Sequence, residues 1–333
     1  MHSKGMNNCR RPTAPHAPIW VRALCATSLA LAASARADEG GVSFWAPGQF
    51  GSFSAVPTDP GWAVPLVYYH VSASAGTSKT FLVGGNVTAG IDATGDLLFF
   101  FPTYTFTQPV LGGQAAFGLG WAVGQLRGTA DVTVINPLGS TVSGRRTDTT
   151  TGGSDLYGLG TLKWHDENNN YMVYTMGGAP TGTYQLGRLA NLSTNHWSID
   201  GGGGYTYFDE KKGHELSIVG GITYNFENPD THYQNGIDGH IDWAASQFFN
   251  EQTHVGVVGY FFQQLTGDSG AGATLGSFKS RIAAVGPEIG YFWPVGKEKA
   301  YVNVKAYWEF GEQNRASGWN FWLSLALPLD LGK

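Results

Sequence analysis

Apolar and polar residues alternate with a period of two near the C-terminus of the chain. Leu323, Leu325 and Leu327 fall on one face of an extended segment, and Ser324 and Ala326 fall on the other. An α-helix repeats every 3.6 residues and cannot keep such an alternation over ten or more positions. The pattern therefore predicts β-strands with one apolar face.

The same alternation recurs along most of the chain and predicts an all-β fold of about twelve strands. An even number of antiparallel strands, apolar outward and polar or small inward, is typical of bacterial transmembrane β-barrels. We expect the strand near 80 to pair with the strand near 329, because hydrocarbon offers no water to an unpaired strand edge. A barrel of fourteen strands, with 64–76 and part of 125–135 added, is the alternative. The twelve segments are 80–91, 95–108, 112–124, 155–164, 169–180, 196–208, 214–226, 237–249, 253–265, 277–292, 299–310 and 317–329.

The connections between these segments alternate between short and long. If the first strand runs outward, the short connections face the periplasm and the long ones face the exterior, which is the polarity of outer-membrane barrels. The run of Thr residues between Ser140 and Gly153 predicts a mobile surface loop. The short connections are 109–111, 165–168, 209–213, 250–252 and 293–298, and the long ones include 125–154, 181–195, 227–236 and 266–276.

Composition agrees with a membrane barrel rather than with an ordinary soluble enzyme. The chain holds 48 glycines in 333 residues, and only 14% of its residues are charged. Glycine is therefore about twice its usual share of roughly 7%, and charge lies well below the roughly 25% of soluble domains. Many of the glycines fall inside the predicted strands, where they relieve crowding in a small, strongly curved barrel.

Residues 1–37 have the features of a Sec signal peptide. A basic head precedes the apolar stretch 23–33, and Ala35-Arg36-Ala37 forms a small-x-small cleavage site, so we expect the mature chain to begin at Asp38. Removal of this segment leaves 15 basic and 25 acidic groups, a net charge of −10 that argues against nucleic-acid binding. Cys9 and Cys25 are removed as well, so the exported chain has no thiol for catalysis or metal binding, and no cofactor is expected.

An N-terminal extended segment, 38–79, precedes the predicted barrel at 80–333. The segment is interrupted by prolines, including Pro60 and Pro65, that disfavour a regular central strand. It could enter the lumen as a hatch. The alternatives are a periplasmic tail, or an extra strand formed by 66–73. The hatch candidates are the apolar rings Phe44, Trp45, Phe50, Phe53 and Trp62.

Several polar and aromatic residues are expected to line the lumen. Asp238, His240 and Asp242 lie at i, i+2 and i+4 of one strand and so face the same way. They could bind a divalent cation, although a polar network that balances Lys305 and Arg281 explains them more simply. The lumen-lining candidates are Asp238, His240, Asp242, Tyr301, Lys305, Tyr307, Glu309 and Trp322.

Two further groups of side chains have both a functional and a structural interpretation. The outward aromatic residues are expected to form a girdle at the membrane interfaces rather than a ligand site. The histidines would serve a barrel hydrolase, but the sequence has no Gly-x-Ser-x-Gly elbow, and we expect no enzyme. The aromatic residues are Tyr291, Phe292, Trp293, Trp308, Phe310 and Trp319, and the histidines are His165, His196, His214, His232 and His254.

An ordered set of motifs resembles the outer-membrane family named after the phenol meta-degradation pathway. The set covers nearly all of the mature chain, and the family brings no established site residues. The motifs are Gly40-Gly41-Val42-Ser43-Phe44-Trp45-Ala46-Pro47-Gly48, Pro60-Gly61-Trp62, Tyr233-Gln234-Asn235-Gly236, Gly259-Tyr260, Asp268-Ser269-Gly270, Phe278-Lys279-Ser280-Arg281, Gly286-Pro287 and Gly318-Trp319-Asn320.

The resemblance implies a barrel that admits aromatic or other hydrophobic compounds. Together with the strand pattern, it leads us to expect a channel in the Gram-negative outer membrane for passive uptake of such solutes. Its expected partners are outer-membrane lipid and lipopolysaccharide, a small hydrophobic solute and the barrel assembly machinery. A barrel hydrolase and a non-transporting structural barrel remain as alternatives.

Overall fold

The computed structural model describes residues 39, 43–83, 86–135, 141–296 and 298–329. All of them lie in the compact unit Ala35–Lys333. The predicted signal peptide, 1–37, lies outside the described residues. In the part of the chain that is described, no helix has the length and apolar character needed to span a membrane.

The described chain is built from β-strands, as the alternation predicts. The strands are β1 (Gly61–Val83), β2 (Asn86–Phe100), β3 (Thr103–Thr105), β4 (Gln114–Ile135), β5 (Thr141–Gly153), β6 (Leu156–Asp166), β7 (Asn169–Ala179), β8 (Ser198–Asp209), β9 (His214–Asn225), β10 (Asp238–Phe248), β11 (Thr253–Gln264), β12 (Arg281–Val295), β13 (Glu298–Gln313) and β14 (Ser317–Leu329).

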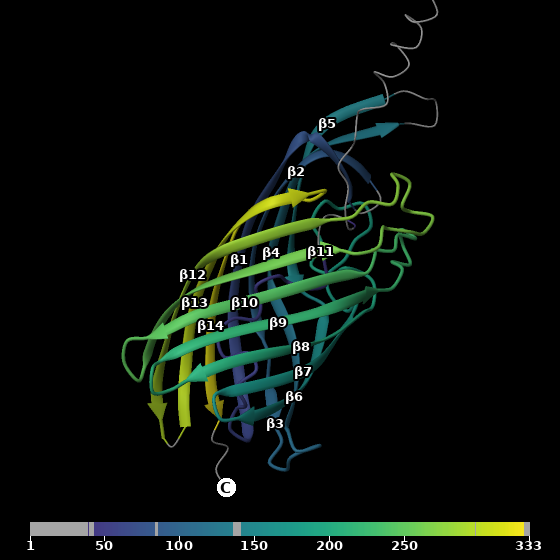
Figure 1. Cartoon of the computed structure of the whole chain (residues 1–333). Coiled ribbons are helices and arrows are strands. Elements are labelled where there is room, and N and C mark those ends of the chain that lie inside the picture. Colours follow the sequence, from purple (N-terminus) through teal and green to yellow (C-terminus); the bar gives the residue numbers. More distant parts are fainter. Residues whose placement is uncertain (1–38, 40–42, 84–85, 136–140, 297, 330–333) are drawn as a thin grey trace, which may run out of the picture. The chain divides into compact units, whose positions relative to one another are not determined.

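Twelve of these strands form a closed antiparallel barrel (Figure 1). Each strand of the ring pairs with its neighbours in chain order; the short β3 lies between β1 and β4 beyond the end of β2, and β5 pairs with β4 outside the ring. The ring closes where β1 pairs with β14, from Trp62 opposite Leu329 to Ser74 opposite Ser317. The prediction of a closed twelve-stranded barrel is confirmed.

The start of the barrel differs from the sequence expectation. Its first strand begins at Gly61, not near residue 80, so 61–79 belongs to the barrel and not to the extended segment. Pro65 lies inside β1, where a proline was expected to prevent a regular strand. Its carbonyl accepts a hydrogen bond from Phe101, in the break between β2 and β3. In a strand, the N–H and the carbonyl of one residue point to the same side. A backbone N–H at position 65 would therefore have faced the break between β2 and β3, so the absence of this donor from proline is tolerated there.

The predicted loop at 125–154 is also wrong. β4 continues to Ile135, and its distal half pairs with β5, whose residues run from Thr141 to Gly153. The Thr run that suggested a mobile loop therefore forms one strand of a hairpin. β-branched threonines are well suited to a strand, and this hairpin extends beyond the ring (Figure 1).

The two ends of the barrel differ in their connections. At the short-turn end, adjacent strands are joined by 167–168, 210–213 and 249–252, and at the long-loop end by 180–197, 226–237 and 265–280. The long loops gather at one end of the strands in Figure 1. Long extracellular loops and short periplasmic turns are typical of outer-membrane barrels.

On β9, polar residues face the interior and apolar residues face outward. Glu215, Ser217 and Thr223 are buried, whereas Leu216 and Ile222 are about half exposed. This is the reverse of a soluble sheet, and it suits a wall that has lipid on its outer side.

Candidate functional site: the lumen and its inserted segment

Residues 43–57, here called the inserted segment, run through the barrel interior. Just before them, Glu39 accepts a 2.8 Å hydrogen bond from Asn228 in the long loop between β9 and β10. At the other end, the carbonyl of Val56 accepts a 3.0 Å hydrogen bond from Lys163, near the short-turn end of β6. The segment therefore passes along the lumen from the long-loop end to the short-turn end, where β1 begins.

The densest polar contacts surround a turn at Gly48. The backbone N–H groups of Gly48 and Phe50 donate to the two carboxylate oxygens of Asp242 on β10, at 2.9 and 3.2 Å. Lys305 on β13 lies 2.7, 3.4 and 3.2 Å from the carbonyls of Gly48, Gln49 and Phe50. One carboxylate and one ammonium group thus satisfy backbone groups that would otherwise be buried without partners.

The turn itself requires glycine. Gly48 has φ +87°, and a Cβ atom there would lie 2.9 Å from the Tyr307 ring and 3.0 Å from the Tyr260 ring. The backbone conformation and the close approach of two rings both exclude a larger residue.

Two carboxylates accept hydrogen bonds from the part of the segment nearer the short-turn end. The hydroxyl of Ser52 lies 2.8 Å from Glu215 on β9 and 2.9 Å from Glu288 on β12. The backbone N–H of Phe53 donates to Glu215 at 3.0 Å, and Asn303 donates to Glu288 at 2.7 Å. Buried acidic side chains therefore act as acceptors for the segment instead of standing free in the lumen.

The Phe53 side chain fills an aromatic cage near the short-turn end. Its ring lies edge-on or tilted to every ring around it, in the geometry that aromatic quadrupoles favour. Phe292 was expected in the outer girdle, but it faces inward because its partner in the register is the inward Tyr301. The rings around Phe53 are Phe208, Phe248, His254, Phe292 and Tyr301.

Trp45 occupies a slot in the half of the lumen nearer the long-loop end. Its indole stacks on the imidazole of His240 with ring centroids 3.5 Å apart and an interplanar angle of 15°. His240 Nε2 lies 2.9 Å from a carboxylate oxygen of Asp200, and both of these side chains are fully buried. Phe44 and Phe50 pack in the same hydrophobic cluster as Trp45.

The structure brings the predicted lumen-lining residues together on the inward face. Six of them make contacts already described or contact each other: Lys305, for example, lies 5.5 Å from the Trp322 ring. Glu309 accepts a 2.7 Å hydrogen bond from Tyr260. Arg281 instead lies exposed at the rim, and its Nε atom donates to the carbonyl of Gly311. That these residues line a route for solute remains a prediction.

Trp62 differs from the other four hatch candidates. Phe44, Trp45, Phe50 and Phe53 lie in the inserted segment, whereas Trp62 lies on β1 and is 44% exposed on the outer wall. The physical reason is the earlier start of the barrel, which places Trp62 opposite Leu329.

Sequence reasoning missed three carboxylates that face the lumen: Asp200, Glu215 and Glu288. All three are buried, and each lies on a strand whose alternation was predicted. The parity of their positions relative to outward residues such as Leu216 was the available signal. We expect the same signal to identify inward charges in related barrels.

The three side chains that could have bound a metal ion, Asp238, His240 and Asp242, each contact another group instead. Asp238 accepts a 2.9 Å hydrogen bond from Asn225, while His240 pairs with Asp200 and Asp242 holds the turn of the inserted segment. Within the described ranges, no group of three or more His, Cys, Asp or Glu residues is arranged to hold a metal ion.

His196 is the histidine that comes nearest to a hydrolase arrangement. Its Nδ1 atom lies 3.2 Å from the Ser198 hydroxyl and 3.0 Å from the Trp197 carbonyl, and burial lowers the pKa of the imidazole. In a hydrolase triad the two ring nitrogens serve the nucleophile and the carboxylate separately. Here one nitrogen makes both contacts, which does not match that arrangement.

The long loops form a hydrogen-bonded cluster around Asp268. Its carboxylate accepts hydrogen bonds from the Tyr233 hydroxyl, the Gly236 backbone and the Gln264 side chain. Burial raises the pKa of the Asp268 carboxyl, while the three donors act in the opposite direction. Two motifs that are distant in the sequence therefore meet and tie the β9–β10 loop to the β11–β12 loop.

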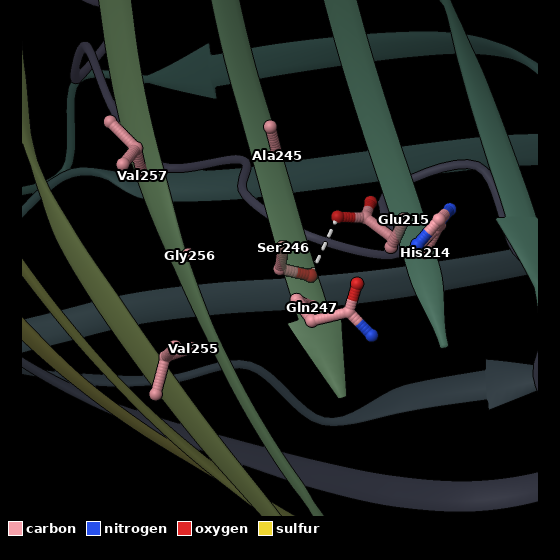
Figure 2. A pocket seen from close by; sticks show the side chains of 8 residues that line it. All are labelled: His214, Glu215, Ala245, Ser246, Gln247, Val255, Gly256 and Val257. Carbon is pink, nitrogen blue, oxygen red and sulfur yellow. Dashed lines mark hydrogen bonds between the residues drawn. The ribbon is translucent and has the colours of Figure 1, made fainter. Parts of the chain in front are cut away.

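Figure 2 shows a pocket at the short-turn ends of β9, β10 and β11. Ser246 donates to Glu215 at 2.9 Å, and Glu215 also holds Ser52 and Phe53 of the inserted segment. The pocket therefore borders the place where Glu215 binds Ser52 and Phe53 of the inserted segment. Its lining residues are His214, Glu215, Ala245, Ser246, Gln247, Val255, Gly256 and Val257.

A protein family described as "Putative MetA-pathway of phenol degradation" matches residues 77–325. The chain belongs to this family. The resemblance inferred from the motifs is thus confirmed. No curated protein sequence matches the chain.

Solved structures show which fold this family member shares. An outer membrane channel from Pseudomonas putida F1 is 14% identical, with a TM-score of 0.60, and the match covers 83% of this chain and 98% of the channel. A Pseudomonas aeruginosa FadL homologue is 9% identical, with a TM-score of 0.35 and coverage of 80% and 89%. The first likeness shows that this chain shares the β-barrel fold of that protein.

Proposed function

We propose that this protein is an outer-membrane channel for passive uptake of small hydrophobic or aromatic compounds, and that the inserted segment is its hatch. The observation that carries the proposal is the character of the wall around the segment. Tyr260, Phe262, Tyr307 and Trp322 form one buried apolar cluster there. Such a wall offers apolar and aromatic contacts to a solute, while lipopolysaccharide resists its passage.

The attachment of the segment suits a hatch. Its polar contacts to Asp242, Lys305, Glu215 and Glu288 are all noncovalent. Hydrogen bonds to charged groups contribute about 1.5–3 kcal/mol each, and breaking a few of them is compatible with repeated opening. The segment could move aside in part, without leaving the barrel.

The remaining features of the proposal follow from export to the outer membrane. Residues 1–37 direct export as a Sec signal peptide, and the barrel assembly machinery inserts the mature chain among lipid and lipopolysaccharide. The protein carries out no reaction and needs no cofactor, because solute enters down its own gradient.

The test measures initial uptake of radiolabelled toluene by intact cells that carry or lack the gene. Toluene crosses phospholipid freely, so the lipopolysaccharide layer must remain intact for a channel to matter. We expect slower uptake without the gene, restoration from a plasmid, and no difference once EDTA has stripped the lipopolysaccharide. Equal initial rates in all intact strains, across a panel of aromatic and aliphatic compounds, would contradict the proposal.

A non-transporting structural barrel is the second candidate, and the filled lumen favours it. Trp45, Ala55, Tyr307 and Phe262 in the interior are all fully buried. This candidate predicts that removal of the inserted segment destabilises the barrel and leaves uptake unchanged.

A further inference from the structure

The slot occupied by Trp45 has the shape of an aromatic binding site. The His240 imidazole forms one wall parallel to the indole, and the Tyr174 ring lies 5.9 Å away at a tilt of 36°. Met172 and Val219 complete the apolar surroundings. Stacked and tilted rings at these distances favour a planar aromatic group over an aliphatic one of the same size.

Glycine makes room for this slot. A Cβ atom at Gly221 would lie 2.9 Å from the His240 ring and would overlap the Tyr174 hydroxyl. Any side chain at this position would displace the two rings that form the walls. Gly221 therefore keeps the site open on the β9 side.

Trp45 does not satisfy the polar atoms of the slot. Its indole Nε1 is buried and has no hydrogen-bond partner among the described residues, and the same is true of Asp200 Oδ1 and His240 Nδ1. A buried indole N–H usually finds an acceptor, and an unpaired buried polar group is destabilising. The slot therefore offers an acceptor and a ring nitrogen that its present occupant leaves unused.

Trp45 can leave the slot while the rest of the segment stays attached. The contacts with Asp242 and Lys305 begin at Gly48, three residues after Trp45, and they involve backbone groups. Loss of the stack would leave those contacts in place. Removal of one ring is thus a smaller step than removal of the whole segment.

We propose that the slot between His240 and Tyr174 is a binding site for planar aromatic solutes that carry one hydrogen-bond donor, and that Trp45 is the built-in competitor that the solute displaces. Asp200 accepts the donor of the solute, and the His240 imidazole stacks on its ring. This inference rests on the proposed function, because it names the substrate class of the same lumen.

The methionines give a readout that is local to the slot. The chain has four, of which Met1 and Met6 lie in the predicted signal peptide, and the other two, Met172 and Met176, lie in the cluster around Trp45. We would label the methionine ε-methyl groups of the mature barrel in detergent with ¹³C and titrate it with indole. Met172→Leu assigns the two signals.

We expect saturable shifts of both methyl signals in the wild-type protein. Trp45→Ala should tighten indole binding about tenfold or more, because the competitor is gone. His240→Leu in that background should weaken it about three- to tenfold, through loss of the stack. 1-Methylindole, which lacks the donor, should bind more weakly than indole. Phe53→Ala is the matched control, since it removes a ring from the other aromatic cage and should leave these shifts unchanged.

Three results would overturn the inference: no methyl shift with indole in folded wild-type or Trp45→Ala protein, equal affinity for indole and cyclohexane, or equal affinity for indole and 1-methylindole. If His240→Leu fails to fold, His240→Phe keeps a ring for stacking and should retain both the shifts and the preference for indole over 1-methylindole, because Asp200 supplies the acceptor. Toluene uptake by cells that coexists with unresponsive methyl groups would leave the channel intact and remove only this site.

Discussion

At the scale of single residues, the lumen is organised by a few side chains that satisfy the backbone of the inserted segment. Asp242 accepts from two N–H groups, and Lys305 donates to carbonyls of the same turn. Both reach the turn because Gly48 adopts a left-handed conformation between two tyrosine rings. The position of the inserted segment therefore depends on one residue without a side chain.

Gly48→Ala should weaken the inserted state by about 1–3 kcal/mol, because it adds strain at positive φ and a clash with the Tyr307 ring. The fraction of molecules with a displaced segment should then rise about 5- to 150-fold. The measurement is the rate at which a water-soluble maleimide labels Ala55→Cys, a buried position in a mature chain expected to have no other thiol.

Gly51→Ala is the matched control for this rate. Its Cβ would approach only the flexible ends of Lys305 and Glu288, at 3.2 and 3.3 Å. Labelling in this variant should stay near the rate of the Ala55→Cys parent. Equal rates for Gly48→Ala and the parent would show that the Gly48 turn does not hold the segment.

At the scale of strands, the outer face of each strand contacts lipid. The free energy cost of placing a charge on that face depends on how deep the residue lies in the membrane. On β14, Leu325 lies between Val302 of β13 and Leu66 of β1 in the register, within an apolar band. Phe310 lies near the long-loop end of β13 and is 53% exposed. Both side chains face the lipid, but they lie at different depths in the membrane.

Leu325→Arg should destabilise the folded barrel by about 2–4 kcal/mol, whereas Phe310→Arg should cost about 0–1 kcal/mol, since charge is tolerated near the interface. Reversible unfolding in urea with lipid vesicles, followed by tryptophan fluorescence, measures both. Equal losses would mean that the apolar band does not span the hydrocarbon where the strand register places it.

At the scale of the whole molecule, closure of the barrel and insertion of the segment are separable. The ring closes through β1 and β14, and neither strand includes residues 43–57. The barrel should therefore fold without the segment, whereas the proposed route through its interior depends on where the segment lies.

Deletion of 43–57 should give larger and more frequent ion conductance steps in planar bilayers than the full mature chain. The reason is that the deletion removes the Trp45 and Phe53 rings and exposes the buried carboxylates to water. Heat-modifiable migration on a detergent gel controls for folding. A folded deletion variant with unchanged conductance would contradict the proposed channel.

The sequence by itself determined the period-two strands and their outward apolar faces, because side-chain alternation is a local property of extended backbone, and it predicted a closed barrel of about twelve strands. It also placed Asp242, Lys305 and Tyr307 on the inward face by parity alone. Only the tertiary structure decided that the barrel starts at Gly61 and that residues 43–57 thread the lumen. Those outcomes depend on contacts between residues about 190 to 260 positions apart, such as Gly48 with Asp242 and Lys305, which no local pattern encodes.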